Sequence, residues 1–329
     1  STLMRSSAAS DVYKRQQLFI HVRNKHNYWN NYLGVVEGDA QTKLLLPEEG
    51  DAMIEIPLQT TQDNIHEVTI FKRQDACHEL TILGFEINCN TDDECELLEA
   101  SPLPPRRIEV YGDSVSAGEV SEAIDYVAKA DPEHNGEYSN SWYSYAWIAA
   151  RKLDAQLHDI AQGGVALLDN TGWYHEPDYI GMEHVWNKMR YDSLYGQVTE
   201  WDFSKYTPDI VIVAIGQNDS HPDDYMKTDY EGEKAQNWRE HYKEFLKKIR
   251  ATYPDAWIVC CTTLLQHDIG WDMSIDQAVQ DLGDKKVSHC VFQRNGKATP
   301  GHLRIPEAEE MAKELCQHIR ALGIEGYEA

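Results

Sequence analysis

The chain has 329 residues, a length typical of two domains. Its 55 acidic and 30 basic side chains give a net charge of −25, which repels nucleic-acid phosphates and anionic membranes, so neither is an expected partner. With 42% hydrophobic and 26% charged residues the composition is globular, and the apolar runs are too short to cross a bilayer.

The first 16 residues are not expected to belong to a fold. They lack the apolar central stretch of a signal peptide, and no apolar periodicity runs through them. Residues 11–16 resemble the translated end of a transposon used to prepare sequencing libraries, so we interpret the segment as foreign, with a natural disordered tail as the alternative. The absent signal peptide predicts a cytoplasmic location, or a secreted one if a natural signal peptide was lost.

Short apolar or alternating runs about ten residues apart predict a β-sandwich in the first domain, which we place at residues 17–103. No helical stripe interrupts these runs. Pro102, Pro104 and Pro105 form a stiff connector that neither a helix nor a central strand tolerates, and they mark the domain boundary. The expected strands are residues 18–22, 43–47, 52–56, 66–72 and 80–87.

In residues 104–329 strands alternate with helices, which predicts a parallel sheet covered on both faces. Apolar stripes with helical spacing recur at residues 142–153, 238–249 and 311–322. The expected fold class is therefore α/β: a jelly-roll-like N-terminal β-sandwich followed by a three-layer α/β/α domain, whose ligands bind beyond the carboxyl ends of its strands. The expected strands are residues 108–111, 157–161, 209–215, 256–261 and 287–292.

Seven cysteines are scattered through the chain, and three of them lie in apolar runs. An odd number in that arrangement indicates buried free thiols, although a bridge between Cys89 and Cys95 stays open. No cysteine or histidine spacing typical of zinc sites occurs, so we expect no metal and no other cofactor.

The first parallel strand runs directly into Gly112-Asp113-Ser114. A serine at a strand end, flanked by small residues, is where an exposed nucleophile belongs, and its own backbone N–H can point at a developing oxyanion. The alternative is an ordinary turn with a serine at the start of a helix. The position of Ser114, more than its motif, favours the nucleophile.

Two further strands end in motifs at the same sheet edge. Gly163 follows the second strand, and Asn218 follows the third within Gly216-Gln217-Asn218-Asp219. The Gly163 N–H and the Asn218 side-chain amide could converge with the Ser114 N–H to form a three-donor oxyanion hole. Each motif alone fits an ordinary turn, but three consecutive strand-end motifs favour a site.

A serine nucleophile needs a base, and position in the fold selects among 14 histidines. His302 lies in the loop before the final helix, at the strand-end edge, and is our candidate. His267, after the fourth strand, is the second choice. His318 lies within a helix, and His289 lies in an apolar strand where it is expected to be core.

These blocks, in this order and spacing over residues 106–323, resemble the SGNH (GDSL-type) hydrolase superfamily. The β-sandwich placed before them makes the chain similar to carbohydrate esterase family two, whose members remove O-acetyl groups from xylan, mannan or related polysaccharides. The resemblance implies Ser114 as nucleophile, His302 as general base, and Ser114, Gly163 and Asn218 as oxyanion donors.

One position departs from the superfamily pattern, because Thr299 stands where an aspartate usually precedes the histidine by three residues. The resemblance then implies a Ser-His dyad, and we expect a main-chain carbonyl of residues 295–301 to orient His302. A distant Asp or Glu is the less favoured alternative. Asp131 and Asp63, each three residues before a histidine, are interpreted as chance matches because both precede the third strand.

The insertion at residues 170–201 is rich in Trp and Tyr, whose flat rings suit sugar faces. Trp173 and Trp186 are our candidates for substrate contact, and packing of the insertion on itself is the alternative. The chain is thus expected to be a serine esterase that removes O-acetyl groups from a neutral polysaccharide or oligosaccharide through an acetyl-serine. A lysophospholipase or arylester hydrolase and a non-catalytic carbohydrate-binding protein are the competing functions.

Overall fold

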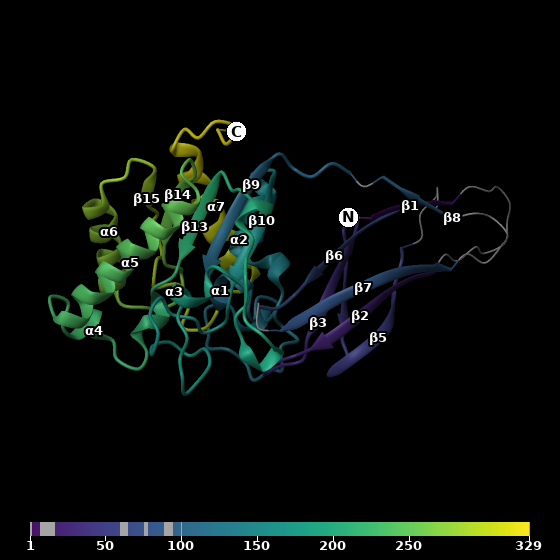
Figure 1. The fold of residues 1–329 in the computed structure, drawn as a ribbon, viewed down its shortest axis with the longest axis horizontal. Coiled ribbons are helices and arrows are strands. Elements are labelled where there is room, and N and C mark those ends of the chain that lie inside the picture. The colour runs from purple at the N-terminus through teal and green to yellow at the C-terminus, as the bar shows by residue number, and fades with distance from the viewer. Residues whose placement is uncertain are drawn as a thin grey trace. The chain divides into compact units, whose positions relative to one another are not determined.

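The computed structural model describes residues 2–6, 17–59, 65–75, 78–88, 95–99 and 101–328. The chain divides into two compact units (Figure 1). The first comprises Ser1–Leu103 with Asn135–Glu137, and the second comprises Pro104–His134 and Tyr138–Ala329. Cys89 and residues 7–16 lie outside the described residues. No helix in the described part is long and apolar enough to cross a membrane.

The first unit contains two antiparallel sheets, with strand orders β4-β3-β6-β1-β8 and β5-β2-β7. The five strands expected from the sequence are present, and β1, β3 and β8 are additional. Strand β1 lies within the first 16 residues, where no strand was predicted. The bounds are β1 Thr2–Ser6, β2 Gln17–Lys25, β3 Tyr32–Glu37, β4 Ala40–Leu45, β5 Glu49–Ile56, β6 Ile65–Lys72, β7 Glu79–Asn88 and β8 Cys95–Leu98.

A core between the two sheets makes this unit a β-sandwich. Alternate residues of β2 are buried, as expected for a strand with one face against a core. They meet buried residues of the other sheet. The shared cluster is Leu18, Ile20, Val22, Leu33, Val35, Leu46, Ile56 and Val68.

The second unit contains a parallel five-stranded sheet in the order β10-β9-β13-β14-β15. The central strand β13 is buried along its whole length, which explains its uninterrupted apolar run. Together with the antiparallel first unit, this sheet confirms the predicted α/β fold class. The bounds are β9 Arg106–Gly112, β10 Ala155–Ala161, β13 Ile210–Ala214, β14 Trp257–Cys261 and β15 Val287–His289.

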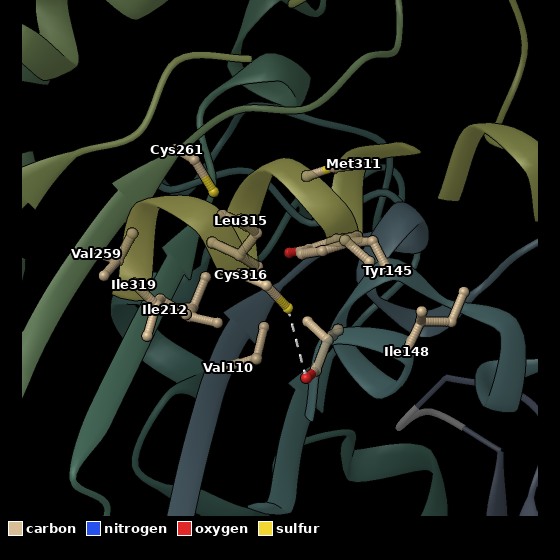
Figure 2. Packing of buried hydrophobic residues seen from close by; sticks show 14 of the residues in the cluster. Val110, Tyr145, Ile148, Ile212, Val259, Cys261, Met311, Leu315, Cys316 and Ile319 are labelled. Atoms are coloured by element: carbon tan, nitrogen blue, oxygen red, sulfur yellow. Dashed lines mark hydrogen bonds between the residues drawn. The ribbon is translucent and has the colours of Figure 1, made fainter. Parts of the chain in front are cut away.

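Helices cover both faces of this sheet. On one face, α2 (Tyr145–Lys152) and α7 (Ile305–Ala321) pack over side chains such as Val110 and Ile212 (Figure 2). On the other face, α5 (Glu233–Thr252) contacts the sheet, and α6 (Ile269–Leu282) packs beside α5. The remaining elements are α1 Ser114–Ala117, α3 Met182–Val185, α4 Tyr225–Thr228, the 3₁₀ turns η1 Ile124–Tyr126, η2 Ser141–Tyr143, η3 Ser193–Tyr195, η4 Phe203–Lys205 and η5 Gln217–Ser220, and the hairpin β11 Lys188–Arg190 with β12 Thr199–Glu200.

The register of the sheet brings three strand ends to one level. Gly112, the last residue of β9, lies opposite Ala161 of β10 on one side and Ala214 of β13 on the other. Each of these residues ends its strand. The turns that follow them therefore emerge side by side at the carboxyl edge of the sheet, where the three sequence motifs lie.

Candidate active site

Ser114 begins the short helix α1 directly after β9. Asp113 caps this helix by accepting the Val115 N–H at 2.9 Å. The helix ends at Gly118, which has φ of 75° and whose Cβ, if present, would lie 2.4 Å from the Asn140 oxygen. Ser114 is 5% exposed, and its N–H belongs to the first helical turn, which has no acceptor within the helix.

The structure brings Ser114 and His302 together. The His302 Nε2 lies 2.8 Å from the Ser114 Oγ, although 188 residues separate the two along the chain. His302 precedes α7, whose docking on the sheet sets its position. Two other histidines considered as the base form contacts away from Ser114. His267 contacts Asp272 at 3.1 Å, and His318 contacts Ser288 at 3.0 Å.

A carboxylate, and not a main-chain carbonyl, lies at the second ring nitrogen of His302. The Asp131 Oδ2 is 2.6 Å from Nδ1, and its Oδ1 accepts the His302 backbone N–H at 2.9 Å. The predicted carbonyl of residues 295–301 was therefore wrong, as was the treatment of Asp131 as a chance match. Thr299 is buried, and its carbonyl accepts the Gln266 N–H at 2.8 Å.

Asp131 was set aside because it precedes the third strand, but strand order does not determine where a loop residue lies in the fold. Asp131 lies between α1 and α2, in a stretch with little regular structure that returns to the carboxyl edge of the sheet. One sequence signal could have revealed it. Gly301 precedes His302, and a Cβ there would lie 2.5 Å from the Asp131 Oδ1 and 2.7 Å from the Lys129 oxygen, so only glycine lets the two segments approach.

The charges around His302 favour its protonated form. Burial lowers the pKa of His302, but the charge of Glu119, the hydrogen bond and charge of Asp131, and the charge of Asp113 raise it to about 9. The Glu119 Oε1 lies 3.8 Å from Nε2, on the side of the ring that faces Ser114. Burial raises the pKa of the Asp131 carboxyl, but its contacts with His302 and the charge of Arg304 outweigh burial and lower the pKa to about 2.

This electrostatic balance predicts an alkaline pH profile. A general base must be unprotonated, so kcat/KM should rise about tenfold per pH unit until the pH approaches 9. Glu119→Gln removes a charge that raises the pKa of His302, and the acidic limb of the profile should move to lower pH. Glu309→Gln, at an exposed position of α7, is the control and should leave the limb in place. An unmoved limb in Glu119→Gln would contradict this assignment.

The turns that carry the expected oxyanion donors contact the two residues before Ser114. The Gln162 N–H donates to the Gly112 oxygen at 3.2 Å, which fixes Gly163 beside the turn that carries Ser114. The Asn218 Nδ2 lies 3.1 Å from the Asp113 Oδ2 and 3.0 Å from the Val165 oxygen. Both amide hydrogens of Asn218 thus have acceptors in this state.

A buried polar network ties these strand-end turns together, and sequence reasoning missed two of its members. The Gln217 Nε2 donates to the Asp113 Oδ2 at 2.7 Å, and its Oε1 accepts from the Thr263 Oγ1 at 2.6 Å. Asp219 accepts the Leu167 N–H at 2.8 Å, which orders the loop after Gly163. Burial raises the pKa of Asp113 to about 6, against the opposing effect of its hydrogen bonds. Sequence reasoning gave Gln217 no role and gave Asp219 none beyond its place in the motif.

The two tryptophans proposed for substrate contact lie in different surroundings. Trp173 is 60% exposed, and its backbone N–H donates to the Gly164 oxygen at 2.8 Å. Its ring stacks on His221 with 3.4 Å between centroids. Trp186 instead makes edge contacts with Tyr111 and Phe245, which are buried. The Trp173 ring is therefore exposed to solvent beside the turn at Gly163, whereas the Trp186 ring packs between the sheet and α5.

Comparison with known proteins agrees with this architecture. No family model matches the chain. It is 31% identical over 234 residues to the cellulase/esterase CelE of Acetivibrio thermocellus, and 30% identical over 231 residues to an acetylxylan esterase / glucomannan deacetylase of Cellvibrio japonicus. These matches cover 68% and 69% of this chain but only 26% and 60% of the two relatives, so the chain spans less than two thirds of either.

Solved structures show the same fold. A family two carbohydrate esterase from Clostridium thermocellum, in complex with cellohexaose, matches with a TM-score of 0.76 and 22% identity over 97% of this chain and 90% of that one. A family two carbohydrate esterase from Cellvibrio japonicus matches with a TM-score of 0.75 and 24% identity over 98% and 87%. The shared fold is a β-sandwich followed along the chain by a parallel α/β sheet. The chain is a homologue of esterases and has the fold of family two carbohydrate esterases, which confirms the predicted resemblance.

Proposed function

We propose that the chain is a serine esterase that removes O-acetyl groups from a neutral polysaccharide or oligosaccharide of the xylan or mannan type. The observation that carries the proposal is the continuous series of hydrogen bonds from Ser114 through His302 to Asp131, at 2.8 and 2.6 Å. A nucleophile, a base and a carboxylate that orients the base are the parts that acyl transfer needs.

In the proposed reaction, the Ser114 Oγ attacks the acetyl carbonyl carbon while its proton passes to the His302 Nε2. The resulting oxyanion accepts hydrogen bonds from the N–H groups of Ser114 and Gly163 and from the Asn218 amide. Asn218 must share one hydrogen that Asp113 or Val165 accepts in the resting state. The C–O bond to the sugar then breaks, and the sugar oxygen takes the proton from His302.

The acetyl-Ser114 intermediate is released by water. His302 accepts a proton from the water as its oxygen attacks the acetyl carbon, and it returns a proton to the Ser114 Oγ when acetate leaves. Asp131 holds the His302 Nδ1–H tautomer and stabilises the imidazolium that forms in both halves of the reaction. Among the described residues no group of three His, Cys, Asp or Glu side chains could hold a metal ion, and no step here uses one.

Acetate release tests the proposal directly. We expect acetate from acetylated xylan and acetylated glucomannan oligosaccharides and from p-nitrophenyl acetate, with turnover falling steeply for octanoate esters. Turnover of long acyl chains or lysophospholipids without acetate release from the oligosaccharides would favour the lipid-hydrolase alternative. Binding of the oligosaccharides with no turnover of any ester would favour a carbohydrate-binding protein.

The sugar part of the substrate is proposed to lie on Trp173. An exposed indole ring next to the oxyanion turn offers a flat apolar face to a sugar, and the charge of −25 disfavours anionic polymers. The family two esterase from Clostridium thermocellum with bound cellohexaose supports a β-linked glycan as ligand class.

Trp173→Ala should therefore separate sugar binding from chemistry. The KM for an acetylated oligosaccharide should rise about tenfold, as expected for loss of about 1.4 kcal/mol of stacking, while kcat/KM for p-nitrophenyl acetate stays within about twofold. Met189→Ala removes another exposed side chain of the same insertion and serves as the control. Equal losses on both substrates would show that Trp173 supports the structure of the site and does not contact sugar.

A further inference from the structure

The segment that carries Asp131 has few elements to hold it. Between Ala123 and Asp131 the only regular structure is the single turn η1, and most of its residues are exposed. The Asp131 side chain itself is 29% exposed. A carboxylate that must stay within hydrogen-bond distance of Nδ1 needs a more rigid support than this backbone provides.

Arg304 supplies such a support. Its side chain is fully buried, and its planar guanidinium donates in several fixed directions. The Nε donates to the Ala123 oxygen at 3.2 Å, and the Nη2 lies 2.9 Å from the Asp131 Oδ1 and 3.5 Å from the Ala130 oxygen. The Nη1 donates to the His302 oxygen. One side chain thus contacts both ends of the segment and the residue that carries the imidazole.

Glu307 extends this support one turn further along α7. Its Oε2 accepts the Arg304 N–H at 2.8 Å, and its Oε1 accepts the Ala128 N–H at 2.9 Å. The Ile305 N–H donates to the Ser121 oxygen at 3.0 Å. The start of α7 therefore holds the segment at several points, and the same short stretch carries His302.

We propose that Arg304 is a positioning residue that sets which oxygen of Asp131 faces His302. The Asp131 Oδ1 is shared by the guanidinium and the His302 backbone N–H, and this leaves Oδ2 for the imidazole Nδ1. Without the planar fork the carboxylate can rotate and turn toward solvent. The inference rests on the proposed function only in that it concerns the same three residues, because the positioning itself is a property of the resting structure.

The test is a double-mutant cycle with p-nitrophenyl acetate. Arg304→Lys keeps the charge and removes the planar fork, and it should lower kcat about 10- to 100-fold with KM changed less than about threefold. In an Asp131→Asn background the same substitution should cost less than about threefold, because there is no carboxylate left to position. Arg294→Lys, at an exposed pair with Glu310, is the control. A full-sized loss in both backgrounds would overturn the proposal.

A second readout does not depend on turnover. The Nδ1 proton of His302 should give a far-downfield NMR resonance in the native protein, and Arg304→Lys should broaden or shift it while Arg294→Lys does not. An unchanged resonance in a folded Arg304→Lys protein would overturn the positioning role. If Arg304→Lys does not fold, Glu307→Gln provides the same comparison with a smaller loss of kcat. If Arg304→Lys loses the resonance while Ser114→Ala keeps full activity, the positioning role stands and the proposed acetyl-Ser114 mechanism is rejected.

Discussion

Replacing Ser114 by alanine should lower kcat for p-nitrophenyl acetate by about 10⁶-fold, as in serine hydrolases whose nucleophile is removed. The reason is that the Ser114 Oγ is the proposed attacking oxygen and lies 2.8 Å from the His302 Nε2, which takes its proton. The measurement is the initial rate of p-nitrophenol release, corrected for uncatalysed hydrolysis. A serine-directed phosphonate should label the wild-type protein at Ser114 alone.

Ser116→Ala is the matched control for this prediction. Ser116 lies in the same four-residue helix, but its Oγ bonds to the Tyr145 hydroxyl at 2.8 Å on the core side. Its replacement should cost about 1 kcal/mol of stability and leave kcat within a few-fold. Labelling at a residue other than Ser114, or full activity of Ser114→Ala, would contradict the assignment of the nucleophile.

Replacing Asp131 by asparagine should lower kcat by about 10³- to 10⁴-fold. An asparagine keeps the size of the side chain, but it no longer stabilises the imidazolium, and its amide N–H₂ favours the wrong tautomer of His302. The drop should be largest at pH 9 and above and smaller below it, because loss of the Asp131 charge lowers the pKa of His302 and leaves more of the variant's imidazole unprotonated at lower pH. The measurement is the pH profile of kcat for wild type and variant.

Asp125→Asn provides the control, since Asp125 is exposed and belongs to the same segment. It should leave kcat unchanged. A loss smaller than tenfold in Asp131→Asn would mean that the contact at 2.6 Å contributes little and that a main-chain acceptor can orient the imidazole. The Ser-His dyad expected from Thr299 would then describe the chemistry better than a triad of Ser114, His302 and Asp131.

The parts of the site that the sequence revealed are those fixed by local structure. An apolar strand followed at once by a small-residue turn places Ser114 at the sheet edge, and the same reasoning located Gly163 and Asn218 after their strands. Because neighbouring parallel strands end in register, these turns had to meet. His302 followed from its place before the last predicted helix.

The parts that were missed depend on contacts between distant segments. Asp131 lies on no strand and no predicted helix, so neither periodicity nor strand order says where it is directed. Gln217 looked like a free position, yet its amide joins Asp113 to Thr263 inside the protein. Trp186 carried the same compositional signal as Trp173, and only packing against Tyr111 and Phe245 distinguishes the two.

The wide separation of Ser114 and His302 along the chain has a consequence for how the protein matures. The nucleophile and Asp131 are synthesised long before the imidazole, and 171 residues separate Asp131 from its partner. On the proposed mechanism, ester hydrolysis cannot begin until residues 302–321 have docked through α7 onto the sheet core. In a refolding experiment, the return of activity would time the docking of α7, whereas tryptophan fluorescence would also report earlier collapse elsewhere in the chain.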